Sequence, residues 1–156
     1  MAKYEILVLN GPNLGHLGQR QPEIYGAQGL DTVPALVDSL LGVRAVDVAL
    51  IFDQYNGEGQ LIDRLERARA EGTNGIVFNA GAYTHTSLAL ADCLAWIGIP
   101  TVEVHISNVW ARPEAIRHQS YMAKSVVGVI AGFGIDSYAL GVAAVVRHIE
   151  TAAIEK

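Results

Sequence analysis

Residues 100–108 read Pro-Thr-Val-Glu-Val-His-Ile-Ser-Asn. Apolar and polar side chains alternate along this stretch, which predicts a β-strand whose polar face carries Glu103, His105 and Ser107 at every second position. Other predicted strands of the chain are apolar on both faces. An acid, an imidazole and a hydroxyl aligned on one strand therefore indicate a functional site rather than a purely structural face.

Strands and helices alternate on either side of this segment. The further strands are predicted at residues 4–9, 46–52, 75–78 and 125–131, and the helices at 31–41, 60–71, 88–97 and 138–153. Asp31 or Thr32 is expected to cap the first helix, and Thr86 or Ser87 the third. Each of the first three strands is followed by a helix, which is typical of βαβ units with a parallel sheet covered on both faces. We therefore predict one α/β domain over residues 1–156, a flavodoxin-like three-layer sandwich with a five-stranded parallel sheet in the order 2-1-3-4-5.

Polar turns are expected where the strands end. They lie at residues 10–14, 53–59, 79–87 and 107–112. Parallel strands joined by right-handed crossovers end at one edge of the sheet, and open α/β sheets bind ligands there, so these turns should lie together. Residues 11–29 are predicted to form a long loop without regular structure, which carries Arg20, Glu23 and Tyr25. Loops of this length are usually functional or mobile in compact domains.

Composition limits the class of protein. The 156 residues are 51% apolar and 17% charged, and the mean hydropathy is +0.26, which favours additional burial in an oligomer. No apolar run reaches the length of a membrane span, and the N-terminal residues lead directly into a strand rather than a signal peptide. The lone Cys93 excludes an internal disulfide and is typical of a reducing cytoplasm. A net charge of −5 argues against a nucleic-acid partner, so we expect a cytoplasmic protein without membrane or nucleic-acid partners.

Five short motifs, in order, resemble those of the type II 3-dehydroquinate dehydratases. They are Asn-Gly-Pro-Asn-Leu at 10–14, Gly-x-Arg-x-Pro-x-x-Tyr-Gly at 18–26, Gly-x-Leu-Ile-Asp at 59–63, Gly-Ala-Tyr-Thr-His-Thr-Ser at 81–87 and Glu-Val-His-Ile-Ser-Asn at 103–108. Each motif alone is weak evidence, but the ordered set spans nearly the whole chain. The resemblance implies a flavodoxin-like hydro-lyase that needs no metal or cofactor and assembles as a homododecamer of four trimers.

The resemblance also implies a reaction, the anti elimination of water from 3-dehydroquinate through an enolate to give 3-dehydroshikimate. In this family a tyrosinate removes the proton next to the ketone, and Tyr25 matches that residue. Because the pKa of a tyrosine is near 10, cations must lower it, and Arg20 and Arg112 match the cations of the motif. Asn13 is expected to hold a water at the enolate oxygen, although an asparagine here also suits a turn that bonds its own backbone.

The leaving hydroxyl needs an acid, and the resemblance assigns that role to His105. Glu103, two residues away on the same face, would orient the imidazole and keep it protonated. The alternatives are a core histidine that is merely hydrogen-bonded, or a Glu-x-His metal pair. A metal site would require His85 and Asp92 to converge on the pair, so no metal is expected.

A second set of residues is expected to bind the substrate: Asn79, His85, Asp92, Ile106, Ser107 and Arg117. By resemblance, the Asn79 amide, the Ser107 hydroxyl and the backbone N–H groups of Ile106 and Ser107 hold the carboxylate. His85 and Arg117 would bond the ring hydroxyls. Asp92 matches a residue that reaches the neighbouring subunit's site, and a solvated helix residue is the equal alternative. His16, His118 and His148 are assigned to surface or structural positions.

Several positions depart from the family pattern. They are Gln21, the turn 53–59, Glu66, Ala80 and the spacing of Arg112 and Arg117. The two arginines are five residues apart where four is usual, and one extra residue in a helical turn rotates a side chain by roughly 100°. Either a local bulge absorbs this residue, or Arg117 is not the equivalent contact and substrate preference has drifted. The proposed catalytic set is intact by residue type.

Other function classes remain open at this point. A flavodoxin-like module that binds phosphate or flavin would need a Ser/Thr/Gly-rich loop after the first strand, where Pro12 instead removes an N–H donor. A non-catalytic relative would be expected to lack Tyr25 or His105, and both are present. A lyase acting on another cyclic hydroxy-ketone acid, and a role in either shikimate synthesis or quinate breakdown, are not separated by the sequence.

Overall fold

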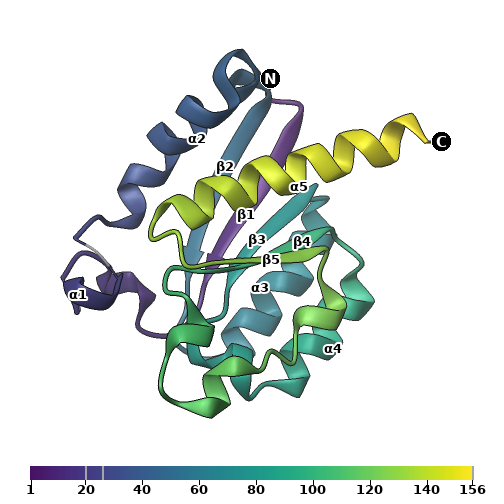
Figure 1. The fold of residues 1–156 in the computed structure, drawn as a ribbon. Coiled ribbons are helices and arrows are strands. Elements are labelled where there is room, and N and C mark those ends of the chain that lie inside the picture. Colours follow the sequence, from purple (N-terminus) through teal and green to yellow (C-terminus); the bar gives the residue numbers. More distant parts are fainter. Residues whose placement is uncertain (20, 26, 156) are drawn as a thin grey trace.

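In the computed structural model, which describes residues 1–19, 21–25 and 27–155, five parallel strands form one sheet in the order β2-β1-β3-β4-β5 (Figure 1). The strands are β1 Tyr4–Asn10, β2 Val48–Gln54, β3 Gly75–Asn79, β4 Thr101–His105 and β5 Gly128–Ala131. All neighbouring strands pair in parallel. The α/β class and the strand order predicted from the sequence are confirmed.

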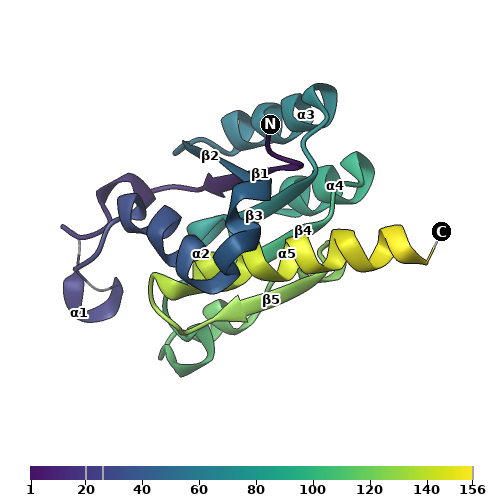
Figure 2. The same cartoon turned by 90° about the horizontal axis from the view of Figure 1, so that it is seen from above.

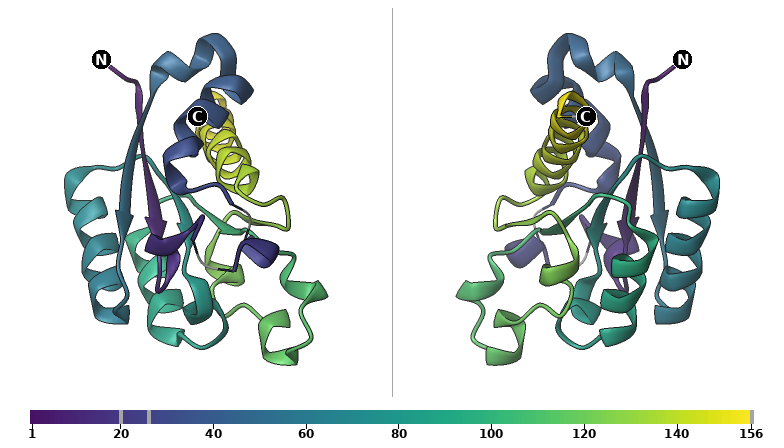
Figure 3. Two further views of the ribbon diagram at one scale, coloured as in Figure 1. Left: turned by 90° about the vertical axis from the view of Figure 1, so that its left-hand side faces the viewer. Right: turned by 90° about the vertical axis from the view of Figure 1, so that its right-hand side faces the viewer.

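Helices cover both faces of the sheet, as Figures 2 and 3 show. Helices α2, Val33–Leu41, and α5, Asp136–Ile154, lie on one face, and α3, Glu58–Glu71, and α4, Leu88–Ile97, lie on the other. The short α1, Pro22–Tyr25, lies on the side where β1 ends (Figure 1). The result is the expected three-layer sandwich. None of the helices described here is long and apolar enough to cross a membrane.

Local signals explain the helix ends that were predicted well. The Ser87 hydroxyl accepts from the Leu90 backbone N–H at 3.0 Å, and Gly98 ends α4 in the left-handed region with φ 66°. Helix α2 follows Thr32, although the Thr32 hydroxyl bonds the Gly29 carbonyl instead of capping the helix. Gly42 then ends α2 with φ 56°.

Other boundaries differ from the prediction, most of them because short helical turns precede the element. The loop 11–29 contains a 3-10 turn at Leu14–His16 and the helix α1, whose first residue is a proline with a φ suited to that position. Residues Gly42–Asp47 and Ala123–Ser125 form 3-10 turns, so β2 and β5 begin later than expected. Helices α3 and α5 each begin two residues earlier than predicted.

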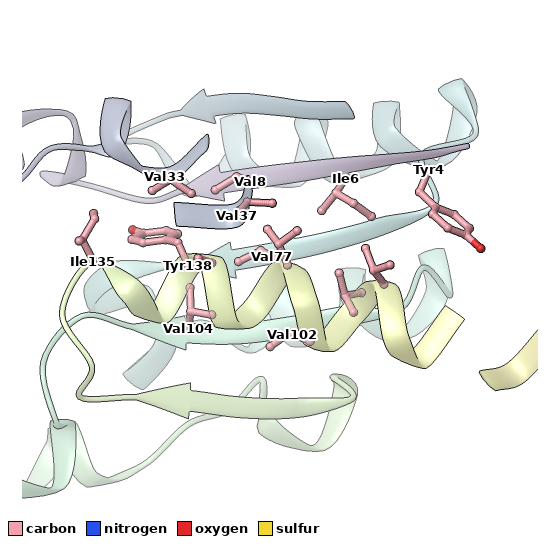
Figure 4. Close-up of a cluster of buried hydrophobic side chains, with 14 of the residues drawn as sticks. Tyr4, Ile6, Val8, Val33, Val37, Val77, Val102, Val104, Ile135 and Tyr138 are labelled. Atoms are coloured by element: carbon pink, nitrogen blue, oxygen red, sulfur yellow. The ribbon is translucent and has the colours of Figure 1, made fainter. Parts of the chain in front are cut away.

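The core is divided between the two faces of the sheet. Strand β1 directs Ile6 and Val8 toward α2 and α5, and Leu7 and Leu9 toward α3 and α4, as the alternation of a strand requires. Figure 4 shows the first of these clusters, in which Tyr138 of α5 packs among valines of the sheet and α2. All these side chains are buried, so the two clusters hold the helices on their faces.

The second cluster contains the lone cysteine. Cys93 lies on α4, is 3% exposed and is a free thiol. Burial raises the pKa of this thiol to about 11, and the negative charge of Glu66 adds to the increase.

The same alternation positions the polar residues of β4. Val102 and Val104 pack toward α5 (Figure 4), so Glu103 and His105 face the opposite side of the sheet. Gly141 allows α5 to approach this strand closely, because a Cβ at that position would lie 2.8 Å from Cγ1 of Val104. The buried valines therefore fix the direction in which the acid and the imidazole point.

Candidate active site

A buried carboxylate and a histidine form the centre of the site. The Glu103 side chain is fully buried, and its Oε1 lies 2.6 Å from Nε2 of His105, which is 6% exposed. The second oxygen, Oε2, accepts a hydrogen bond from the Ser120 hydroxyl at 2.8 Å. A buried carboxylate costs free energy unless it is paired and hydrogen-bonded, and here both oxygens have a partner. Glu103 therefore lies at hydrogen-bond distance from His105, as its expected role in orienting the imidazole requires.

A second histidine stacks against the first. His85 ends the 3-10 turn Gly81–His85 that follows β3, and its ring centroid lies 6.2 Å from that of His105 with 17° between the planes. Nδ1 of His85 lies 2.6 Å from the carbonyl oxygen of Gln119, so this nitrogen carries a proton and donates it. The other nitrogen is then able to accept a hydrogen bond.

Burial lowers the pKa of His85, and the positive charges of His105 and Arg117 lower it further. The hydrogen bond to the Gln119 carbonyl acts in the opposite direction but is the smaller effect. His85 is therefore a neutral imidazole near pH 7, suited to a hydroxyl group rather than to an anion.

Both histidines line a cavity of about 170 Å³ at the carboxyl edge of the sheet. The sequence-predicted residues that line it are Asn13, Asn79, His85, His105, Ile106, Ser107, Arg112 and Arg117. They come from the ends of β1, β3 and β4 and the turns that follow, which are spread over residues 13–117 of the chain. The prediction that these turns meet at one edge is confirmed. The turn 53–59 does not line the cavity but supports a residue that does, because the Asn56 side chain accepts a hydrogen bond from the Asn13 backbone N–H at 3.1 Å.

Two arginines form the basic side of the cavity. Arg112 and Arg117 both line it, and the Glu114 carboxylate lies 3.7 Å from Nε of the first and 3.6 Å from Nε of the second. Arg112 directly follows the 3-10 turn Val109–Ala111, and Arg117 lies in a second 3-10 turn, Ala115–His118, so the two arginines are not on one helix. The helical rotation expected from their five-residue spacing therefore does not arise, and both arginines reach the cavity.

Hydrogen bonds fix the Asn79 amide at the end of β3. Its Nδ2 donates to the Tyr138 hydroxyl at 2.9 Å, its Oδ1 accepts from the Gly81 N–H at 3.1 Å, and the Tyr138 hydroxyl donates to Oδ1 of Asn10 at 2.6 Å. Burial raises the pKa of Tyr138, so its hydroxyl stays protonated. An amide nitrogen has two hydrogens, and one of those on Asn79 is left for a ligand.

Asn13 has the left-handed backbone of a turn, with φ 68°. Asn13 lines the cavity, and its side chain does not cap the 3-10 turn that follows. The backbone therefore has the conformation of the turn alternative, and the residue borders the space that is open to a ligand.

Four predicted site residues remain, and for two of them the side chain lies outside the described part of the chain. Arg20 lies outside the described residues, and so does the side chain of Tyr25, whose backbone ends α1. Glu103 stands behind His105 rather than on the cavity lining. Asp92 is exposed on α4, as the solvated-helix alternative required of a single chain. The described part of the chain contains no group of three or more His, Cys, Asp or Glu side chains placed to hold a metal ion.

The histidines assigned to the surface are exposed: His16, His118 and His148. Sequence reasoning missed Gln119, Ser120 and Tyr138, which contact the site residues. Gln119 acts through its carbonyl, which no sequence pattern reveals. Tyr138 could have been suspected as the one aromatic hydroxyl on the buried face of α5, at the end of the helix nearest the predicted site. Ser120 has no local signal, because its partner is 17 residues away in the chain.

The fold and the cavity together define a flavodoxin-like α/β protein with a candidate acid–base site that offers arginines to an anionic ligand. The family model described as Dehydroquinase class II matches residues 4–146. The chain belongs to the class II dehydroquinase family.

Similar proteins agree with this assignment. A 3-dehydroquinate dehydratase of Azorhizobium caulinodans is 52% identical over 139 residues, which cover 89% of this chain and 91% of that protein. Another from Gloeothece citriformis is 48% identical over 149 residues, covering 96% of this chain and 95% of that one. The crystal structure of the type II dehydroquinase from Butyrivibrio crossotus superposes with a TM-score of 0.83 at 38% identity, covering 91% of this chain and 97% of that chain.

Proposed function

We propose that this protein is a hydro-lyase that eliminates water from 3-dehydroquinate to give 3-dehydroshikimate. The observation that carries the proposal is the buried Glu103–His105 pair at the wall of a cavity that also exposes Arg112 and Arg117. Family membership supports the reaction, because similar proteins are 3-dehydroquinate dehydratases. The chemistry needs a base, a donor for the enolate oxygen and an acid for the leaving hydroxyl.

The acid step follows from the orientation of the imidazole. With Nε2 of His105 directed at Glu103, Nδ1 is the nitrogen that can give a proton to the departing hydroxyl. In the doubly protonated imidazole, Nε2–H is bonded to Glu103 and Nδ1–H is free to face the leaving hydroxyl. The hydroxyl takes that proton and leaves as water.

The base step is assigned to Tyr25, with Arg20 and Arg112 lowering the pKa of its hydroxyl. This assignment rests on the motif at residues 18–26 and on Arg112, which lines the cavity. Asn13 would hold a water against the enolate oxygen, and this residue borders the same space. No cofactor or metal is required by this sequence of steps.

The substrate would be held by neutral donors on one side and by charged or imidazole groups on the other. The backbone N–H groups of Ile106 and Ser107, the Ser107 hydroxyl and the Asn79 amide suit the carboxylate, since several N–H groups can converge on one anion. His85 and Arg117 suit the ring hydroxyls. The neutral state of His85 supports that role.

We further propose that the enzyme works as a dodecamer of four trimers in the cytoplasm. Large apolar side chains are exposed on the single chain, among them Trp96, Trp110, Ile116 and Phe133, and their burial would stabilise an assembly. Asp92 lies on α4 beside Trp96, where it could reach a neighbour's cavity. Light scattering of the purified protein measures this directly, and a monomeric mass with full activity would contradict it.

The reaction is tested by following the absorbance of the conjugated enone while the purified protein meets 3-dehydroquinate. We expect a rise with the wild type and a rise at least a hundredfold slower with Tyr25→Phe, the factor typical of a lost general base. A full rate in the variant would remove Tyr25 from the mechanism. No rise with the folded wild type would refute the proposed substrate, and other cyclic hydroxy-ketone acids would then be screened.

A further inference from the structure

Two consecutive residues, Gln119 and Ser120, contact both histidine systems of the site. The Gln119 carbonyl accepts from Nδ1 of His85 at 2.6 Å, and the Ser120 hydroxyl lies 2.8 Å from Oε2 of Glu103. They follow directly after the turn Ala115–His118, which carries Arg117. Residues 119 and 120 thus contact His85 directly and His105 through Glu103, although neither of them lines the cavity that contains the substrate-binding residues.

The direction of the Ser120 hydrogen bond is set by its other partners. Its oxygen accepts from the backbone N–H groups of Met122 at 3.2 Å and Ala123 at 3.1 Å. With both acceptor positions used, the single hydroxyl hydrogen is donated to Glu103. The chain of donors then runs from the backbone through Ser120 to Glu103, where the other oxygen meets His105.

We propose that Ser120 is a positioning residue for the acid step: its hydroxyl holds the Glu103 carboxylate in the place and orientation from which that carboxylate aligns His105. The inference rests on the proposed function. In the described residues, His105 and Ser120 are the side chains that hydrogen-bond Glu103. Without the hydroxyl, one oxygen of a fully buried carboxylate loses its donor, which costs more than the loss of an ordinary surface contact.

Ser120 acts on the reaction from the side away from the substrate. Ser120 and Glu103 line a separate cavity of about 220 Å³, which the two histidines also border. Neither of them lines the cavity that holds Asn13, Asn79 and Ser107. A change at Ser120 should therefore alter the departure of the hydroxyl and leave substrate binding and proton removal intact.

The experiment compares exchange with elimination in D₂O. Once the base has removed the proton next to the ketone, the enolate either takes up a deuteron and returns to labelled substrate, or expels hydroxide, which leaves as water with the His105 proton. We expect Ser120→Ala to lower kcat about tenfold, the rate factor for one hydrogen bond to a charged group, with KM within twofold. The ratio of deuterium in remaining substrate to product formed should rise about tenfold. Ser120→Thr, which keeps the hydroxyl, should restore both.

Ser87→Ala is the matched structural control. The Ser87 hydroxyl also accepts from a backbone N–H, that of Leu90, and donates to a glutamate, Glu58, but away from the cavity. The Ser87→Ala variant should show a decrease in unfolding midpoint comparable to that of Ser120→Ala. Its ratio of deuterium in remaining substrate to product formed should equal that of the wild type. A kcat loss in Ser120→Ala with an unchanged ratio would show a merely structural role and overturn the inference, as would an unchanged kcat.

The outcome also separates the two proposals. A wild type that neither exchanges nor eliminates would overturn the proposed function and the role of Ser120 with it. An active wild type with an unaltered Ser120→Ala variant would overturn the role of Ser120 alone. A double-mutant cycle measures how strongly the two side chains are coupled. In a Glu103→Gln background, Ser120→Ala should lower kcat little further, because Ser120 acts on the reaction through Glu103.

Discussion

The pKa of His85 is set by what surrounds its ring, and burial has the largest effect, lowering it below the ordinary 6.5. In the unfolded chain the same side chain takes up a proton near pH 6.5, so between that value and the lower folded pKa the unfolded state binds more protons. Stability contributed by the neutral His85 is therefore present above pH 6.5 and is lost as the pH falls through this window.

We predict that His85→Asn loses less stability on acidification than the wild type does. Urea unfolding at pH 7.5 and again roughly two units lower, in the range where histidines titrate, gives the two differences. His148→Asn, a change at an exposed histidine, is the control and should behave as the wild type. Equal losses in His85→Asn and the wild type would contradict the assigned cause.

Much of the site could be anticipated residue by residue, for a physical reason. Residues at strand ends, such as Asn79 and His105, are brought together by the parallel topology itself, so a correct strand order also predicts their neighbourhood. Ser120 and the Gln119 carbonyl reach the site through the path of an irregular segment, which no periodicity describes. The role of Tyr25 stays a prediction from its motif.

At the scale of the elements, prediction succeeded where a local cap or a terminating glycine sets the boundary. Helix α4 has the predicted limits because Ser87 and Gly98 define both ends. It failed where a 3-10 turn has no distinct pattern, as before β2 and β5. The rotation considered for Arg112 and Arg117 assumed one helix, whereas the segment between them is irregular, as the alternative of a local bulge allowed.

The segment with these two arginines contains a competitor for the substrate. Glu114 lies near both guanidinium groups. A hydrogen bond to its own backbone N–H is the main cause that lowers the pKa of this carboxyl, and the two arginines lower it further, so it is ionised at neutral pH. An anionic ligand therefore competes with this carboxylate for the two guanidinium groups.

We therefore predict that Glu114→Gln lowers KM for 3-dehydroquinate about twofold and weakens its dependence on salt, because exposed ion pairs are weak and screened. Steady-state kinetics at low and high ionic strength measure this. Glu155→Gln removes an equal charge from an exposed position just beyond the C-terminal end of α5 and should leave KM unchanged. A higher KM in Glu114→Gln would mean that Glu114 organises the arginines instead of competing for them.

At the scale of the whole molecule, the position of α5 against the sheet decides how the site is supported. Tyr138 and Gly141 lie on this helix, one bonded to Asn79 and the other against Val104 of β4. The strand that carries the Glu103–His105 pair is thus held by the helix on its opposite face. Stability and activity should fall together when this contact is opened.

We predict that Gly141→Ala destabilises the protein by about 1–3 kcal/mol, because its new Cβ would meet Cγ1 of Val104 at 2.8 Å and of Val77 at 3.1 Å. Gly59→Ala is the matched control: nothing lies within 4 Å of its Cβ position in α3, and alanine favours a helix. Denaturant unfolding should show opposite signs for the two variants. An unaffected Gly141→Ala would imply that α5 can shift outward at no cost.

The free thiol of Cys93 on α4 can be used to detect local opening of the helix layer in which it is buried. At neutral pH Cys93 is protonated and enclosed, so alkylating reagents and oxidants react with it only when α4 separates from the layer beneath it. The rate at which iodoacetamide labels Cys93 in the native protein therefore measures how often α4 opens. Because the chain has a single cysteine, the label reports on this layer alone, and a substitution that loosens the layer should speed the labelling.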